Sequence, residues 1–169
     1  AAGMEEHVVS GGEQITCKGI WDTIQPNPKC WIAPGAHGVL TLPGAIENSC
    51  NCFFYEVGYQ LSLIDDKYNA EAGLNRLNKY AYAYGLDRKS GIEIEESVPE
   101  CSDEYPVPSA IGQGTNNFTT VGLARYVTAV ANSGTVYDLS LLDKVTDANG
   151  NEEKRISELP VIGRGAFFF

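Results

Sequence analysis

The sequence predicts a mainly helical α+β fold. Apolar residues recur at helical spacing in several stretches between residues 41 and 132, and short runs of strand-forming residues precede and follow them. The 169 residues are 43% hydrophobic and 20% charged, which is enough for one ordinary globular core or two small lobes. A net charge of -10 disfavours nucleic acid or an anionic membrane surface as the main partner.

The first forty residues predict little regular structure. Residues 1–9 have the pattern of a helix end, closed by the breaker Ser10-Gly11-Gly12. Three short strand-like runs separated by Pro- and Gly-rich turns then predict an irregular β-hairpin over residues 13–40. These runs begin at Gln14, Cys30 and Val39.

A helical lobe is predicted from Thr41 onward. Thr41 can cap a short helix that ends at Glu47, and a second helix carries apolar residues at the helically spaced positions 54, 57, 58 and 61. A third helix follows Asp66 and ends at Gly85, the usual C′ glycine. Its apolar stripe consists of Leu74, Leu77, Ala81 and Tyr84.

The second half of the chain predicts a long connection, one helix and a strand pair. Residues 85–110 are rich in Gly, Pro and acidic residues, with one strand-like run at Ile92-Glu93-Ile94. Thr119 or Thr120 then caps a helix that ends at Asn132-Ser133-Gly134. Its predicted apolar face is Leu123, Ala124, Val127, Val130 and Ala131. Strand-like runs at 139–145 and 153–156 flank Asp147-Ala148-Asn149-Gly150, where Asn-Gly favours a tight hairpin turn.

Two patterns resemble a nucleotide-binding loop and a zinc site, but their residue spacing does not match either site. Gly112-Gln113-Gly114 has the first two glycines of a nucleotide-binding loop, but the third would fall on Asn117. The cysteines and His37 include no CxxC or HxxxH pair, so their spacing does not predict zinc. We therefore expect no cofactor and no metal. Cys17 and Cys30 lie on the two arms of the expected hairpin, so a disulfide between them stays open if the domain is outside the cell, and otherwise they are buried thiols.

One ordered set of motifs resembles a known family. Ser49-Cys50-Asn51, followed by Cys52-Phe53-Phe54-Tyr55-Glu56, resembles the Ser-x-Asn region of class B penicillin-binding proteins. Further motifs agree in order over roughly residues 1–155. They are Cys30-Trp31, His37-Gly38, the Lys89-Ser90-Gly91-Ile92 connection, Ile111-Gly112-Gln113-Gly114 and the run Thr119 to Ala124.

The resemblance implies a partial transpeptidase-like fold with a helical lobe, an irregular hairpin before it and a strand pair after it. It also implies a D,D-transpeptidase that cross-links cell-wall peptidoglycan, and supports cell shape, through a serine acyl-enzyme trapped by β-lactams. Peptidoglycan stem peptides and β-lactams would be its partners. By the same resemblance, Ser49 relays a proton, Asn51 orients the acyl-donor amide, and Gly112, Gln113 and Gly114 border the substrate cleft.

Two motifs of that family are missing at the matching places. No Ser-x-x-Lys supplies a nucleophile with its activating lysine, and no Lys-Thr-Gly appears before Phe169. We therefore expect a fragment that is inactive alone, from a protein anchored at the outer face of the cytoplasmic membrane by a segment outside this chain. The alternative is a non-catalytic extracytoplasmic module for packing or partner binding. On the local level, the alternative role of Ser49 is to cap the second helix, with Asn51 in its first turn.

The last residues depart from the family pattern. We expect a partial transpeptidase domain over residues 1–159 and a non-matching tail over residues 160–169. The tail ends in Phe167-Phe168-Phe169, and exposed apolar residues at an open chain end favour self-association.

Overall fold

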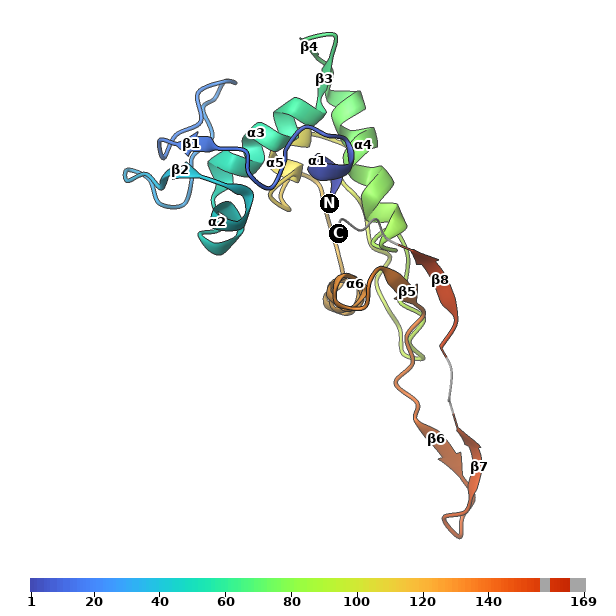
Figure 1. The fold of residues 1–169 in the computed structure, drawn as a ribbon. Coiled ribbons are helices and arrows are strands. Elements are labelled where there is room, and N and C mark those ends of the chain that lie inside the picture. The colour runs from blue at the N-terminus through green and yellow to red at the C-terminus, as the bar shows by residue number, and fades with distance from the viewer. Residues whose placement is uncertain (156–158, 165–169) are drawn as a thin grey trace. The chain divides into compact units, whose positions relative to one another are not determined.

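The described chain combines three helices of 11 to 14 residues with shorter helical turns and two-stranded antiparallel sheets (Figure 1). The computed structural model describes residues 1–155 and 159–164. Their contacts define two units, each with its own buried cluster: unit 1 is Ala1–Lys79 with Ser102–Asn116, and unit 2 is Tyr80–Cys101 with residues 117–164. The mixed α+β class predicted from the sequence is confirmed. Within the described residues, no helix has both the length and the apolar character needed to cross a membrane.

Unit 1 begins with α1 (Ala2–Glu5) and an irregular hairpin. β1 (Ile15–Cys17) pairs antiparallel with β2 (Gly38–Leu40), so that Ile15 lies opposite Leu40 and Cys17 opposite Gly38. The excursion between them is closed by a bridge from Ile20 to Lys29. Gly19 permits this closure, because its φ is +82° and a Cβ there would lie 2.0 Å from a backbone oxygen of the same excursion. The predicted hairpin is therefore confirmed.

The central helix of unit 1 is α3 (Asn51–Leu61), which follows the short α2 (Leu42–Glu47). Six of its residues are buried: Cys52, Phe53, Tyr55, Val57, Gly58 and Leu61. A one-turn helix that the sequence did not predict, α5 (Pro106–Ser109), packs against α3 at Gly58. Because Gly58 has no side chain, the backbones of α3 and α5 can approach each other closely.

The third predicted helix starts later than expected. Asp65 and Asp66 both have positive φ, 48° and 60°, and make the two-residue turn between β3 (Leu63–Ile64) and β4 (Lys67–Tyr68). The helix α4 (Ala70–Ala83) then begins after Asn69, whose Oδ1 accepts the Ala72 N–H at 2.9 Å. The side chains of the predicted stripe, Leu74, Leu77, Ala81 and Tyr84, are buried or half-buried, as expected.

The end of α4 belongs to unit 2 and closes as predicted. Gly85 has φ +71°, its N–H donates to the Tyr82 carbonyl, and the Leu86 N–H donates to the Ala81 carbonyl, both at 2.9 Å. This pair of bonds is the Schellman motif. The buried guanidinium of Arg125 donates to further carbonyls of this turn, those of Gly85, Arg88 and Lys89.

Arg125 lies on α6 (Thr120–Ala131), where the predicted cap is right and the predicted apolar face is wrong. Thr119 Oγ1 accepts the Gly122 N–H at 3.1 Å, as an N-cap does. The buried residues, however, are Gly122, Arg125 and Ala129, while Leu123, Val127 and Val130 are exposed. The buried face of α6 is the one that carries Arg125, which donates to the backbone carbonyls after α4. The spacing of apolar residues alone cannot predict a buried face that is built around an arginine.

The strands of unit 2 form two pairs. β6 (Lys144–Thr146) and β7 (Glu152–Arg155) make the predicted hairpin around the Asp147 to Gly150 turn (Figure 1). β5 (Thr135–Tyr137) pairs with β8 (Val161–Arg164), which lies in the segment predicted to be a separate tail, and that division stays a prediction. The predicted strand at 92–94 is absent from the described structure, where Glu96 instead accepts bonds from the N–H and hydroxyl of Ser90. Phe167 to Phe169 and Ile156 lie outside the described residues.

Candidate functional site

Ser49 lies at the sharp junction between α2 and α3. Its N–H donates to the Ile46 carbonyl at 3.1 Å, and the Cys50 N–H donates to the Ala45 carbonyl at 2.9 Å. These two bonds form a second Schellman motif, and its left-handed position, normally glycine, is filled by Ser49 with φ 49°. A non-glycine residue there costs on the order of 1–3 kcal/mol, and such costs cluster at functional sites.

The two residues after Ser49 diverge in direction. Cys50 is fully buried and occupies the N-cap position of α3 with an extended backbone (φ -78°, ψ 105°). Asn51 is the first residue of the helix and is half-buried, while Ser49 is exposed. The prediction that Asn51 lies in the first turn is confirmed, whereas the N-cap is Cys50 and not Ser49. The inward turn of Cys50 leaves Ser49 and Asn51 on the outer side of the junction.

Ser49 and Asn51 line the same pocket. It has a volume of about 310 Å³, and the remaining lining residues are Ile46, Phe54, Ala110 and Ile111. The pocket therefore combines one hydroxyl and one carboxamide with an apolar wall built from α2, α3 and the end of α5. Such a surface can align a polar group of a ligand by hydrogen bonds and can bury an apolar part beside it.

Tyr55 lies close to Asn51 in the helix. The Asn51 side chain lies near the hydroxyl of Tyr55, one helical turn further along α3. Burial, together with the nearby thiols of Cys52 and Cys30, raises the pKa of Tyr55, and the proximity of Asn51 opposes this rise. Tyr55 also donates to the Lys29 carbonyl at 3.4 Å. The i, i+4 spacing was the available signal for this pair.

The predicted cleft border, Gly112, Gln113 and Gly114, directly follows the lining residue Ile111. These three residues are not among those that line the pocket. A hydroxyl network holds the loop instead: Ser109 donates to Ser102 at 2.7 Å, and the Thr115 N–H donates to Ser102 Oγ at 3.1 Å. The role of Gly112, Gln113 and Gly114 at a substrate cleft stays a prediction.

A cluster of thiols lies behind the junction. Sγ of Cys17, Cys30 and Cys50 and one ring nitrogen of His37 all lie within 4.8 Å of one another. Burial raises the pKa of Cys17, but hydrogen bonds from His37, Gly19 and Cys50 outweigh this effect and lower it to about 6. Burial raises the pKa of Cys50 to about 12. Cys17 and Cys30 are free thiols, so their disulfide stays a prediction.

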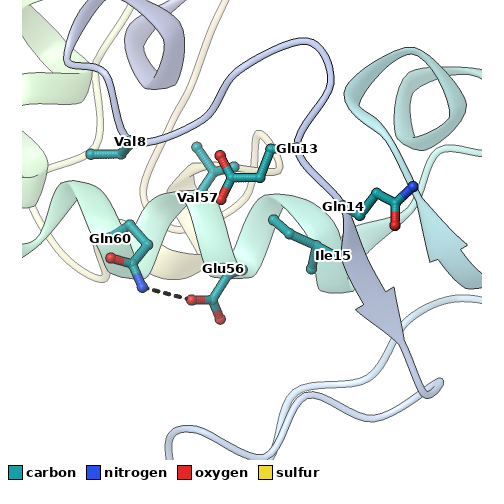
Figure 2. Close-up of a pocket in the computed structure, with 7 residues that line it drawn as sticks. All are labelled: Val8, Glu13, Gln14, Ile15, Glu56, Val57 and Gln60. Atoms are coloured by element: carbon teal, nitrogen blue, oxygen red, sulfur yellow. Dashed lines mark hydrogen bonds between the residues drawn. The ribbon is translucent and has the colours of Figure 1, made fainter.

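A second pocket, of about 370 Å³, lies along the other side of α3 near the start of β1 (Figure 2). Two acidic residues, Glu13 and Glu56, line this pocket, and Glu56 points toward Gln60, whose Nε2 donates to Glu56 Oε1 at 2.8 Å. The other oxygen, Oε2, accepts the Trp21 indole N–H at 2.9 Å. Both carboxylate oxygens are thus engaged by neighbours, which favours a structural role for Glu56.

The family of the chain follows from comparison with known proteins. Residues 1–162 match the model of the penicillin binding protein transpeptidase domain. The chain therefore belongs to this family, as the resemblance of its motifs implied.

Individual relatives and structures agree with this assignment. Stage V sporulation protein D of Bacillus subtilis (strain 168) is 27% identical over 174 residues, covering 96% of this chain and 25% of that protein. A solved structure of penicillin-binding protein 2B from Streptococcus pneumoniae (strain 5204) shares the fold, with TM-score 0.77 and 23% identity over 99% of this chain and 30% of that one. Another is the imipenem acyl-enzyme complex of penicillin-binding protein A from M. tuberculosis, with TM-score 0.75 and 16% identity over 96% of this chain and 37% of that one. The chain thus spans about a quarter of the length of the curated relative.

Proposed function

We propose that the chain is part of a D,D-transpeptidase domain that cross-links peptidoglycan through a serine acyl-enzyme and is acylated by β-lactams. One observation carries the proposal: Ser49 and Asn51 present a hydroxyl and a carboxamide to one pocket from a junction of unfavourable backbone geometry. The family supports it, and so does the acyl-enzyme that penicillin-binding protein A forms with imipenem.

In this proposal Ser49 carries a proton during acylation. The attacking serine, from a Ser-x-x-Lys motif outside these 169 residues, gives its proton to the lysine as it bonds to the acyl carbon. Ser49 Oγ accepts a proton from that lysine and gives its own to the leaving nitrogen, so that the chain ends the step unchanged.

Asn51 has an orienting role in the same step. Its carboxamide both donates and accepts hydrogen bonds, which suits it to hold the amide of the acyl donor. The loop Gly112-Gln113-Gly114 would border the cleft in which the stem peptide or β-lactam lies. The domain would act outside the cytoplasmic membrane, where peptidoglycan is cross-linked.

Acylation by a fluorescent penicillin tests these roles in a protein that carries the complete domain. Removal of a proton relay typically costs ~10²–10⁴-fold in rate. We expect Ser49→Ala and Ser49→Gly to lower the acylation rate by that order, and Asn51→Ala to weaken acylation as well. Ser10→Ala, at an exposed serine outside the pocket, is the matched control and should leave the rate unchanged.

The glycine variant separates chemistry from folding. Glycine fits the left-handed backbone at position 49, so Ser49→Gly should preserve or raise the melting temperature while it slows acylation. If both position-49 variants and Asn51→Ala acylate at the normal rate with changed melting temperatures, the pocket serves the fold only. A non-catalytic packing or partner-binding module would then be the better description.

A further inference from the structure

Four groups of the kind that bind transition metals meet in the core of unit 1, and the transpeptidase roles proposed above use none of them. They come from separate parts of the chain: Cys17 ends β1, Cys30 lies in the excursion, His37 precedes β2, and Cys50 is the N-cap of α3. Their spacing in sequence is irregular, and this is why the sequence predicted no metal. The fold, however, brings the four ligand atoms within 4.8 Å of one another.

One distance within the cluster matches the spacing of two ligands on a tetrahedral ion. Zinc binds cysteine sulfur at about 2.3 Å and histidine nitrogen at about 2.05 Å, so at a tetrahedral angle those two ligand atoms stand about 3.6 Å apart. Cys30 Sγ and His37 Nδ1 are 3.6 Å apart. Three thiols and one imidazole make the Cys₃His set that is typical of structural zinc.

Burial and unmet hydrogen bonding add a second line of support. Cys17, Cys30 and Cys50 are 1%, 2% and 0% exposed, so a bound ion would be closed off from solvent on the sulfur side. The half-buried His37 ring faces the thiols through Nδ1, and its Nε2 has no hydrogen-bond partner among the described residues. The polar contacts of the ring in the described structure are therefore those with the cluster.

We propose that Cys17, Cys30, His37 and Cys50 hold one Zn²⁺ as a closed structural site. Each thiol that binds the ion releases its proton to solvent, and the ring binds as neutral imidazole. The ion ties the end of β1, the excursion and the start of α3 to one point. Because Cys50 lies between Ser49 and Asn51, the same ion fixes the junction that presents those two side chains.

Zinc content tests the proposal without any use of acylation, so its failure and the failure of the proposed function are distinguishable. The full chain, purified under reducing conditions without chelators, should contain about one zinc per chain. Cys30→Ser and Cys50→Ser should lower the bound zinc by about tenfold or more. Cys101→Ser is the matched control, because Cys101 lies in unit 2 outside the cluster, and it should keep the full content.

Cobalt gives a measurement that does not depend on the folding of variants. Co²⁺ added to the reduced, metal-free wild-type chain should produce the visible bands of a tetrahedral ion and a thiolate-to-cobalt charge-transfer band, and one equivalent of Zn²⁺ should erase both. The proposal is overturned if the wild type holds less than about 0.1 zinc per chain and gives no such cobalt spectrum. It is also overturned if Cys30→Ser and Cys50→Ser retain stoichiometric zinc, or if the purified protein carries a Cys17–Cys30 disulfide.

Discussion

At the scale of single residues, the pocket depends on how Asn51 is oriented. A carboxamide at the first position of a helix can rotate freely unless a neighbour fixes it, and the hydroxyl of Tyr55 is the polar group near the Asn51 side chain. The Tyr55 ring is 5% exposed and packs 6.0 Å from the Trp21 ring, so its position is set by the core. We therefore expect Tyr55 to be a positioning residue, which acts through Asn51.

Tyr55→Phe should slow penicillin acylation in the complete domain by about 2- to 10-fold, which corresponds to one neutral hydrogen bond of about 0.5–1.5 kcal/mol. The phenylalanine keeps the ring packing and removes only the hydroxyl. A double-mutant cycle with Asn51→Ala distinguishes positioning from stability, because the second change should add nothing once Asn51 is absent. Fully additive effects on the acylation rate would contradict the role of Tyr55.

The sequence predicted some of these residues and could not predict others. Ser49 and Asn51 stand in a short motif, so an ordered resemblance can find them. Tyr55 and the cysteine cluster depend on distance in space. Cys17 and Cys50 are far apart in the chain, and the packing of β1 against α3 brings them together.

At the scale of elements, the wall of the pocket depends on the contact between α3 and α5. A Cβ added at Gly58 would lie 2.8 Å from Ala110 Cβ and 3.1 Å from the Pro106 carbonyl oxygen. The Pro106 oxygen is backbone, so it cannot move aside as a flexible side chain could. The helix α5 and the pocket residues Ala110 and Ile111 that follow it would have to shift together.

Gly58→Ala should lower the free energy of unfolding by about 1–3 kcal/mol, the usual cost of overpacking a core. Chemical denaturation measures this change. The matched control is Gly12→Ala, where an added Cβ meets nothing within 4 Å. Equal stability of the two variants would mean that α5 tolerates displacement and does not define the pocket wall.

The elements that the sequence missed share a physical cause. α5 is a single turn that contains two prolines, and β3 and β4 are two residues each, so none of them has room for a periodic pattern. The apolar face of α6 was misplaced because a buried arginine, whose pKa burial lowers, occupies the inward side. The helix end at Gly85 and the helix start at Thr119 were predicted correctly, because capping signals are local.

At the scale of the whole molecule, the chain spans only part of the length of its relatives. The match with the sporulation protein covers 96% of this chain and 25% of that protein. The pocket residues on the chain offer a hydroxyl and an amide but no activated nucleophile, because none of its serines is followed by lysine at the third position. In the proposed function, a proton relay without a nucleophile cannot start the covalent step.

The 169-residue chain should therefore not be labelled by a fluorescent penicillin. Gel fluorescence and intact mass measure the labelling, and a protein with the complete domain is the positive control. Stoichiometric labelling that mass spectrometry assigns to any residue of this chain would contradict the proposed division of roles. Trace labelling that persists after the chain is denatured is chemical background and would leave the expectation intact.

The left-handed backbone at Ser49 narrows the substitutions that the position can tolerate. Glycine and asparagine adopt this conformation most readily, but neither carries a hydroxyl. Threonine carries one, yet its branched Cβ makes a positive φ a true outlier. Serine thus combines the hydroxyl with a tolerable backbone cost. If Ser49 carries the proposed relay, a lineage under selection by β-lactams would have few tolerated substitutions at position 49, because most changes there lose either the hydroxyl or the turn.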